Sequence, residues 1–221
     1  PENRREAMES DEWPEWEKAE KKEVKLCFDR GAFEIVDAKE AEGHTVITAR
    51  EVYERKLNPD GTTNKLRMRL VGRGFQEKEG KDFKWDEIFS PVAQIKSFRL
   101  LLAISVLFDW GAYHWDVSGA YLYGGIKGKL FMKFPACMEK RPGKLIRLRK
   151  SLYGLKEAGA IWFRFFRKLL LGLGFIPLLT DVCVYYHETI NMMLSIHVDD
   201  AIVVTDNEVE SDRILRELRK S

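Results

Sequence analysis

Cysteine and histidine are scarce in this chain, and long apolar runs are absent from it. The three cysteines (Cys27, Cys137 and Cys183) form no Cys-x-x-Cys motif, and the four histidines lack metal-binding spacing. This pattern suggests a reducing compartment, and neither a disulfide framework nor a zinc site. No run of about 18 apolar residues is present, so we expect no membrane span. No basic segment followed by an apolar core opens the chain, so we expect no secretory signal.

The net charge of +2 conceals a strong segregation of charge along the chain. Residues 127–168 hold 13 basic and two acidic residues, whereas residues 169–221 hold four basic and nine acidic residues. A basic track followed by an acidic segment suits a polyanionic substrate such as a nucleic acid. A solvated basic face explains the basic block equally well.

Two adjacent aspartates, Asp199 and Asp200, interrupt an otherwise apolar stretch. β-favouring residues 193–198 and 201–205 flank the pair, which predicts two strands joined by a tight turn. Neighbouring carboxylates repel each other, and a hairpin that presents both at its tip can hold divalent cations. The alternative is an ordinary polar turn, since aspartate is common in turns.

A third acid, Asp116, ends a short alternating strand that begins near residue 113. Two-metal phosphoryl transfer needs carboxylates that converge from separate strands. Asp116 with Asp199 and Asp200 meets this need. His114 and His197 each lie two residues before an acidic residue, a position that favours packing on the same strand face.

Alternating patterns and turn residues predict several strands in the first third of the chain. Residues 33–36 and 46–53 contain β-favouring apolar residues, and residues 58–61 (Asn-Pro-Asp-Gly) are a strong turn signal. Residues 65–71 alternate basic and apolar side chains, which predicts a strand with one cationic face. Together with the preceding strand and the turn it is expected to form a hairpin that bears Lys65, Arg67 and Arg69, which we call the basic hairpin. Residues 1–20 are polar and acidic, and favour either a helix or a loosely packed arm.

Longer apolar periodicities predict helices further along. A buried helix is expected to begin at Ser90-Pro91, because proline suits the first helical turn, and to end by Gly111. An amphipathic helix is expected after residues 151–155, with Trp162 in a core-facing aromatic stripe. The remaining strands and the last helix are predicted at residues 130–134, 145–149, 182–186, 192–198, 201–205 and 211–220. This order indicates an α+β fold, a largely antiparallel sheet with helices packed on one face.

Six segments together resemble the reverse transcriptase of Ty1/copia-type LTR retrotransposons, in the order and at the spacing of that family. They are residues 69–76 (Arg-Leu-Val-Gly-Arg-Gly-Phe-Gln), 89–93 (Phe-Ser-Pro-Val-Ala), 115–117 (Trp-Asp-Val), 120–122 (Ala-Tyr-Leu), 150–156 (Lys-Ser-Leu-Tyr-Gly-Leu-Lys) and 198–200 (Val-Asp-Asp). The resemblance covers roughly residues 12–221. It implies an RNA-directed DNA polymerase, a nucleotidyltransferase that extends a primer with deoxynucleotides.

The resemblance also implies the fingers and palm of a right-hand polymerase. On that basis we expect an acidic N-terminal arm leading into the fingers at residues 1–42, fingers at 43–110, and palm with the first catalytic aspartate at 111–126. A fingers/palm strand pair with its loop follows at 127–155, and palm with the Asp-Asp hairpin at 156–221. The resemblance implies that the thumb, the primer-gripping hairpin, a later general-acid lysine and the RNase H domain lie outside this chain. We therefore expect a fragment of a larger polyprotein, whose activity alone is not assured.

The family's catalytic triad falls on Asp116, Asp199 and Asp200. The resemblance implies that they hold two Mg²⁺ ions, for which Mn²⁺ can substitute, with help from the Val117 backbone carbonyl. Tyr121 falls on the aromatic steric gate that excludes a 2′-hydroxyl, the alternative being ordinary core packing. The residues implied to lie beside the nucleotide are Lys65, Arg67, Arg69, Arg73, Tyr153, Gly154 and Lys156.

The chain departs from the family pattern after Lys156. Glu157, Gly159 and Ala160 stand where the family usually has Gln, Pro and Arg. A catalytically decayed relic that binds only RNA or primer–template therefore remains an alternative. A two-metal nuclease is a third hypothesis, although it gives the gate and the basic hairpin no role.

The partners implied are an RNA template, a DNA primer and deoxynucleoside triphosphates, without a membrane. The parent polyprotein is expected to carry protease, integrase and RNase H. The expected location is cytoplasmic virus-like particles, with the DNA product going to the nucleus.

Overall fold

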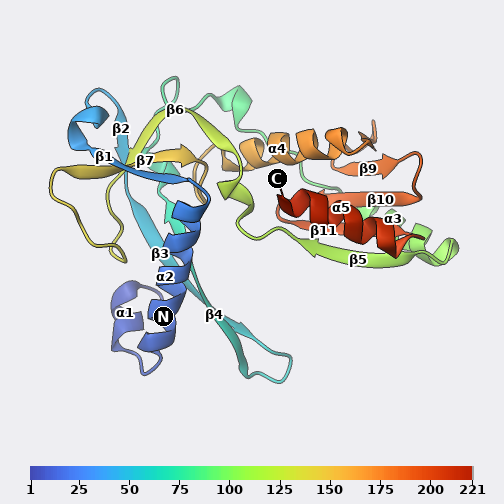
Figure 1. Ribbon diagram of the computed structural model, residues 1–221, viewed down its shortest axis with the longest axis horizontal. Coiled ribbons are helices and arrows are strands. Elements are labelled where there is room, and N and C mark those ends of the chain that lie inside the picture. Colours follow the sequence, from blue (N-terminus) through green and yellow to red (C-terminus); the bar gives the residue numbers. More distant parts are fainter. Residues whose placement is uncertain (221) are drawn as a thin grey trace. The chain divides into compact units, whose positions relative to one another are not determined.

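The computed structural model describes residues 1–220 and divides into two compact units (Figure 1). Unit 1 comprises Pro1–Ile88 and Tyr121–Ile161, and unit 2 comprises Phe89–Ala120 and Trp162–Ser221. The described residues form helices and three separate β-sheets, so the α+β class is confirmed. The single-sheet prediction is wrong because the strands pair in groups of four, two and five.

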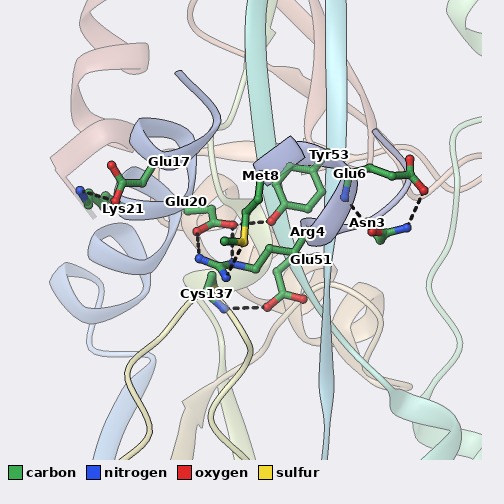
Figure 2. Close-up of polar contacts among 10 residues, drawn as sticks. All are labelled: Asn3, Arg4, Glu6, Met8, Glu17, Glu20, Lys21, Glu51, Tyr53 and Cys137. Atoms are coloured by element: carbon green, nitrogen blue, oxygen red, sulfur yellow. Dashed lines mark hydrogen bonds and ion pairs between the residues drawn. The ribbon is translucent and has the colours of Figure 1, made fainter. Parts of the chain in front are cut away.

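Unit 1 begins with two helices, α1 (Arg4–Glu9) and α2 (Trp13–Asp29). Trp16 is fully buried, and the Glu20 carboxylate is 3% exposed. Figure 2 shows how this carboxylate is satisfied: the Arg4 Nε–H donates to it at 3.0 Å, and the Tyr53 hydroxyl donates to it as well. Because a buried charge is costly unless it is paired, this network indicates well-packed helices and not a loose arm.

The first sheet of unit 1 has the strand order β1-β7-β6-β2. Its strands are β1 (Phe33–Asp37), β2 (Thr45–Ile47), β6 (Gly125–Met132) and β7 (Lys144–Lys150). β6 and β7 form the predicted strand pair, which is antiparallel, whereas β2 and β6 pair in parallel. Ile47, Met132, Ile146 and Leu148 lie in the fully buried core beneath this sheet.

The predicted basic hairpin is confirmed as β3 (Ala49–Leu57) and β4 (Thr63–Gly72). The turn at Asn58 is closed by the Gly61 N–H, which donates to the Asn58 carbonyl oxygen at 2.9 Å. Met68 and Leu70 are buried where α2 contacts β4, and the alternating basic residues occupy the other strand face. Four short 3₁₀ helices complete this unit and its borders: η1 (Ala38–Ala41), η2 (Gly74–Gln76), η3 (Trp85–Glu87) and η4 (Ala120–Leu122).

Unit 2 contains an antiparallel sheet with the order β5-β11-β10-β9-β8 (Figure 1). The strands are β5 (Gly111–Asp116), β8 (Phe175–Pro177), β9 (Val184–His187), β10 (Met192–His197) and β11 (Asp200–Thr205). Val203 and Val204 point to opposite faces and both are fully buried. The expectation of helices on one face is therefore wrong for this sheet, because both of its faces are covered.

Helix α3 (Ile95–Leu107) covers one of these faces through Leu101. It begins four residues after Pro91 and not at Pro91 as predicted. The Asp181 carboxylate accepts hydrogen bonds from the Gln94 N–H at 3.0 Å and the Ser97 hydroxyl at 2.6 Å, which caps the helix at Gln94. The prediction of a buried helix is also wrong, since Leu107 is 76% exposed and only Leu101 and Ser105 are buried.

The last two helices are α4 (Ala158–Gly172) and α5 (Glu208–Lys220). The expectation that the α4 aromatic stripe is core is confirmed at Trp162 and Phe166, which are 3% and 2% exposed. No helix in residues 1–220 combines the length and apolar character that a membrane crossing requires.

Candidate functional site

The Asp-Asp hairpin has the shortest common loop, two residues long. His197 pairs with Asp200, so Val198 and Asp199 alone connect β10 to β11. Val198 has a φ of +59°, one of two positive values among the described non-glycine residues. A positive φ at the first loop position alone is the pattern of a type II′ turn, which prefers glycine there. A β-branched residue in this region is strained, and such strain is typical of functional sites.

The strand register brings the three predicted aspartates to one end of the unit 2 sheet. Asp116 on β5 lies opposite Asp200 on β11, and the Val117 N–H donates to the Asp199 carbonyl oxygen at 2.9 Å. Directly opposed residues in an antiparallel pair have Cα atoms about 4.5–5.5 Å apart. Asp116 and Asp200 are also exposed. Two carboxylates therefore face solvent from adjacent strands, and the third, that of Asp199, lies on the turn that joins β10 to β11.

One oxygen of this acidic cluster already has a partner within the chain. His114 Nε2 lies 2.8 Å from the Asp200 Oδ1, across the β5–β11 pair. In residues 1–220, no three Asp, Glu, His or Cys side chains converge closely enough to hold a metal ion. The donor set nevertheless fits a hard cation, because Mg²⁺ prefers carboxylate and carbonyl oxygens. Asp116, Asp199 and the Val117 carbonyl are the groups that could hold it, with Asp200 shared between His114 and the cation.

The strained turn is held from the side by helix α4. The Trp162 indole Nε1–H donates to the Val198 carbonyl oxygen at 2.5 Å, and Trp162 itself is nearly fully buried. The ring of Phe166 packs 5.0 Å from that of Trp162, centroid to centroid. The turn that carries Asp199 is thus restrained by a rigid, buried side chain.

A second cluster, in unit 1, joins three of the predicted nucleotide-binding residues. The rings of Tyr121 and Tyr153 meet edge to face with centroids 4.7 Å apart. The Arg69 guanidinium lies 5.7 Å from the Tyr153 ring centroid and forms a 2.6 Å ion pair with Glu54. A guanidinium held between a ring and a carboxylate has a defined orientation. Arg69 is therefore a cation of the basic hairpin that the structure places beside Tyr153, whose ring in turn meets that of Tyr121.

The other three predicted cations are spread along β4 and beyond its end. Lys65 and Arg67 occupy the same face of β4 as Arg69, opposite Lys56 and Glu54 of β3. Arg73 follows the end of β4, and its backbone N–H donates to the Thr48 carbonyl oxygen at 2.9 Å. The structure therefore does not gather all four cations at one point.

Gly154 makes a close backbone approach, but its neighbour is Gly72 at the end of β4. Gly154 has a φ of +85°, and a Cβ there would collide with the Gly72 carbonyl oxygen. The Gly72 N–H also donates to the Tyr153 carbonyl oxygen at 2.7 Å. The glycine therefore allows β4 to pack against the loop that carries Tyr153.

Lys156 begins the stretch in which the sequence departs from the family pattern. Its ammonium lies 5.8 Å from the Trp85 ring centroid, and its backbone N–H donates to the Glu77 carboxylate at 2.9 Å. Burial, reinforced by the neighbouring Asp82 and Glu157, raises the pKa of Glu77 to about 7. Two of the three departures, Glu157 and Ala160, are buried, and Gly159 is half-buried.

Sequence reasoning missed three residues of the unit 2 site. His114 was expected to pack, Trp162 to serve the core, and Val198 to be an ordinary strand residue. The spacing His-x-Asp already placed His114 on the face of Asp116, but only the β5–β11 register shows that it reaches Asp200. No sequence signal pairs Trp162 with Val198, because 36 residues separate them.

Comparison with known proteins gives the same family as the sequence motifs. A family model described as reverse transcriptase (RNA-dependent DNA polymerase) matches residues 31–221. The chain is 34% identical over 169 residues to the retrovirus-related Pol polyprotein from transposon RE2 of Arabidopsis thaliana, which covers 74% of the chain and 11% of that protein. It is 29% identical over 226 residues to the corresponding polyprotein from transposon TNT 1-94 of Nicotiana tabacum, covering 100% of the chain and 17% of that protein.

A yeast relative shows the same relationship. The transposon Ty1-H Gag-Pol polyprotein of Saccharomyces cerevisiae is 30% identical over 190 residues, covering 83% of the chain. The chain spans only 10% of that polyprotein.

Proposed function

Because the chain belongs to the reverse transcriptase family of Ty1/copia-type retrotransposons, we propose that it is the polymerase core of such an element's Pol polyprotein. In this proposal it adds deoxynucleotides to a DNA primer along an RNA template, within cytoplasmic virus-like particles. The observation that carries the proposal is the register of β5 against β11. It sets Asp116 opposite Asp200 and bonds Val117 to Asp199.

The proposed roles follow from chemistry and placement. Asp116, Asp199 and Asp200 supply carboxylate oxygens, with the Val117 carbonyl as a further donor. When bound, Mg²⁺ ions would activate the attacking hydroxyl and neutralise charge on the transferred phosphate and its leaving group. The turn strain at Val198 and the bond from Trp162 keep Asp199 in one position, which limits the reorganisation needed during the reaction.

Unit 1 would handle the incoming nucleotide. The Arg69 guanidinium suits the oxygens of a triphosphate, since its fork donates two parallel hydrogen bonds. Tyr121, braced by the Tyr153 ring, is proposed as the gate that excludes a 2′-hydroxyl. We assign Lys65, Arg67, Arg73, Gly154 and Lys156 to the surroundings of nucleotide and template.

Primer extension on an RNA template tests the proposal, using this chain and the same chain within its full-length parent protein. Asp199→Asn is expected to lower Mg²⁺-dependent deoxynucleotide incorporation at least about 100-fold, as loss of a main electrostatic group does. Asp206→Asn is the matched control, because Asp206 lies beyond the opposite end of β11 and bonds Asn191. Equal activity in wild type and Asp199→Asn would refute the proposed role.

A binding-only relic is the second candidate. It is favoured by the contact between His114 and Asp200, which engages an oxygen needed for metal binding. Tight binding of an RNA–DNA heteroduplex without any Asp199-dependent incorporation, in the full-length parent as well, would establish this alternative.

A further inference from the structure

A basic pocket of about 720 Å³ lies in unit 1 and is distinct from both clusters described above. It is bounded by the start of β3, by Arg73 after β4, and by the loop between β6 and β7. We name it the β6–β7 basic pocket. Its charged lining consists of Arg73, Lys133, Lys140, Arg141, Lys144 and Glu51.

The walls of the β6–β7 basic pocket are held together by hydrogen bonds from three backbone N–H groups. The Lys133 N–H donates to the Ile47 carbonyl oxygen at 3.0 Å, and the Arg73 N–H is bonded to Thr48. Figure 2 shows the third tie, in which the Cys137 N–H donates to the Glu51 carboxylate at 3.0 Å. These bonds join three separate parts of the chain, so the pocket is a built feature and not a chance surface hollow.

The positive charge around this pocket is mostly uncompensated. Lys144 forms an ion pair with Asp37 at 2.9 Å. In residues 1–220, the other four cations have no carboxylate oxygen within 4.0 Å. Four like charges around one hollow repel each other, and an anion that bridges them would stabilise the arrangement.

The uncharged lining adds a second requirement on the occupant. Phe134, Pro135, Pro142 and Leu145 contribute apolar surface to the same hollow. A small inorganic anion would use the cations alone, whereas a nucleotide unit brings phosphates for the cations and the flat face of a base for these residues. The volume lies within the roughly 300–1,000 Å³ typical of pockets that bind organic ligands.

We propose that the β6–β7 basic pocket binds a nucleotide unit of a single-stranded stretch of RNA, with backbone phosphates on the cations and a base on the apolar lining. The identity of the occupant rests on the proposed polymerase function, because the single-stranded RNA would then be the unpaired part of the template. The excess of basic residues in the surrounding segment supports a polymer over a free nucleotide, because β6 and β7 belong almost wholly to residues 127–168, which hold 13 basic and two acidic residues. Lys127, Lys144 and Arg149 of these strands are ion-paired.

The test is the salt dependence of binding of a labelled, unstructured oligouridylate to the full chain. For single strands, each phosphate contact contributes about 0.7 to the slope of log K against log salt concentration. The double variant Lys140→Gln/Arg141→Gln is expected to reduce that slope by about 1.4 and to weaken binding. Both side chains are exposed, so the fold is expected to persist, and thermal unfolding verifies it.

The control removes the same charge elsewhere in unit 1. Lys22→Gln/Lys78→Gln alters two exposed lysines that do not line the pocket. Equal effects from both double variants would overturn the proposal, since the binding would then reflect overall charge. An unchanged slope in Lys140→Gln/Arg141→Gln would overturn it as well.

The two proposals fail separately. Asp199→Asn is expected to leave oligouridylate binding unchanged, because Asp199 lies in unit 2 and not in this pocket. If incorporation is independent of Asp199 while the slope changes as expected, only the polymerase role is refuted. If incorporation depends on Asp199 while the slope is unchanged, only the pocket assignment is refuted.

Discussion

The indole of Trp162 donates a hydrogen bond to the carbonyl oxygen of Val198 at 2.5 Å. Val198 has a φ of +59°, a conformation that costs about 1–3 kcal/mol for a β-branched residue. The bond therefore joins a buried helix residue to the strained residue that precedes Asp199. It makes Trp162 a positioning residue for the turn in addition to a core residue.

Trp162→Phe is expected to lower the rate of primer extension about five- to tenfold, since one hydrogen bond contributes about 1 kcal/mol. Val198→Gly relieves the backbone strain, so the turn then depends less on the hydrogen bond from Trp162. Trp162→Phe should therefore lower the rate of primer extension by a smaller factor in a protein that already carries Val198→Gly. The kcat and the KM for the nucleotide are measured in wild type, both single variants and the double variant, together with thermal unfolding. An identical loss with and without Val198→Gly would contradict restraint of the turn.

Tyr121→Val is expected to admit ribonucleotides, because the ring braced by Tyr153 no longer fills the space of a 2′-hydroxyl. The ratio of kcat/KM for deoxy- over ribonucleotides should fall at least about tenfold. Tyr121→Phe keeps the ring and should keep the ratio. If valine and phenylalanine variants discriminate equally well, Tyr121 serves packing and not selection.

Gly154→Ala is expected to destabilise unit 1 more than the same change at Gly128. Both glycines have a similar positive φ, +85° and +82°, so the left-handed conformation costs each variant about 1–2 kcal/mol. Only at Gly154 would the new Cβ collide with a backbone oxygen, that of Gly72. Overpacking of this kind adds about 1–3 kcal/mol, measurable by urea unfolding. Equal losses at the two positions would show that the approach to Gly72 is not tight.

Glu77→Gln is expected to change how stability depends on pH. Burial raises the pKa of Glu77 from 4.5 to about 7, so between these values only the folded state holds the proton. The free energy of unfolding therefore falls as pH rises through this window, and it is highest, for this group, below pH 4.5. The glutamine variant has no titrating carboxyl at this position, so its free energy of unfolding does not fall for this reason. Above pH about 8 it should exceed that of wild type by on the order of 1 kcal/mol.

The Glu77 measurement is denaturant unfolding at pH about 4 and about 8, comparing each variant with wild type so that other titrating groups cancel. Glu79→Gln, an exposed neighbour in the same segment, is the control. A constant difference between Glu77→Gln and wild type at both pH values would disprove the raised pKa.

Local sequence patterns predicted the elements whose causes are local. The alternation over residues 65–71 and the turn at Asn58 reappear as β4 and its hairpin, because period-two burial and turn preference act within a few residues. The start of α3 was predicted wrongly because its cap, Asp181, lies 87 residues from Gln94. The exposure of Leu107 was missed for the same reason, since an apolar helix does not reveal how much surface other elements leave uncovered.

By itself, the sequence determined the family, the α+β class, the positions of Asp116, Asp199 and Asp200, and the basic segment around residue 140. These depend on residue identity and short-range spacing, which a linear pattern records. Only the tertiary structure decided that Asp116 faces Asp200, that His114 reaches Asp200, that Trp162 holds Val198, and that Arg69 is the cation beside Tyr153. Each of these depends on strand register or long-range packing, where a shift of one residue turns a side chain to the opposite face.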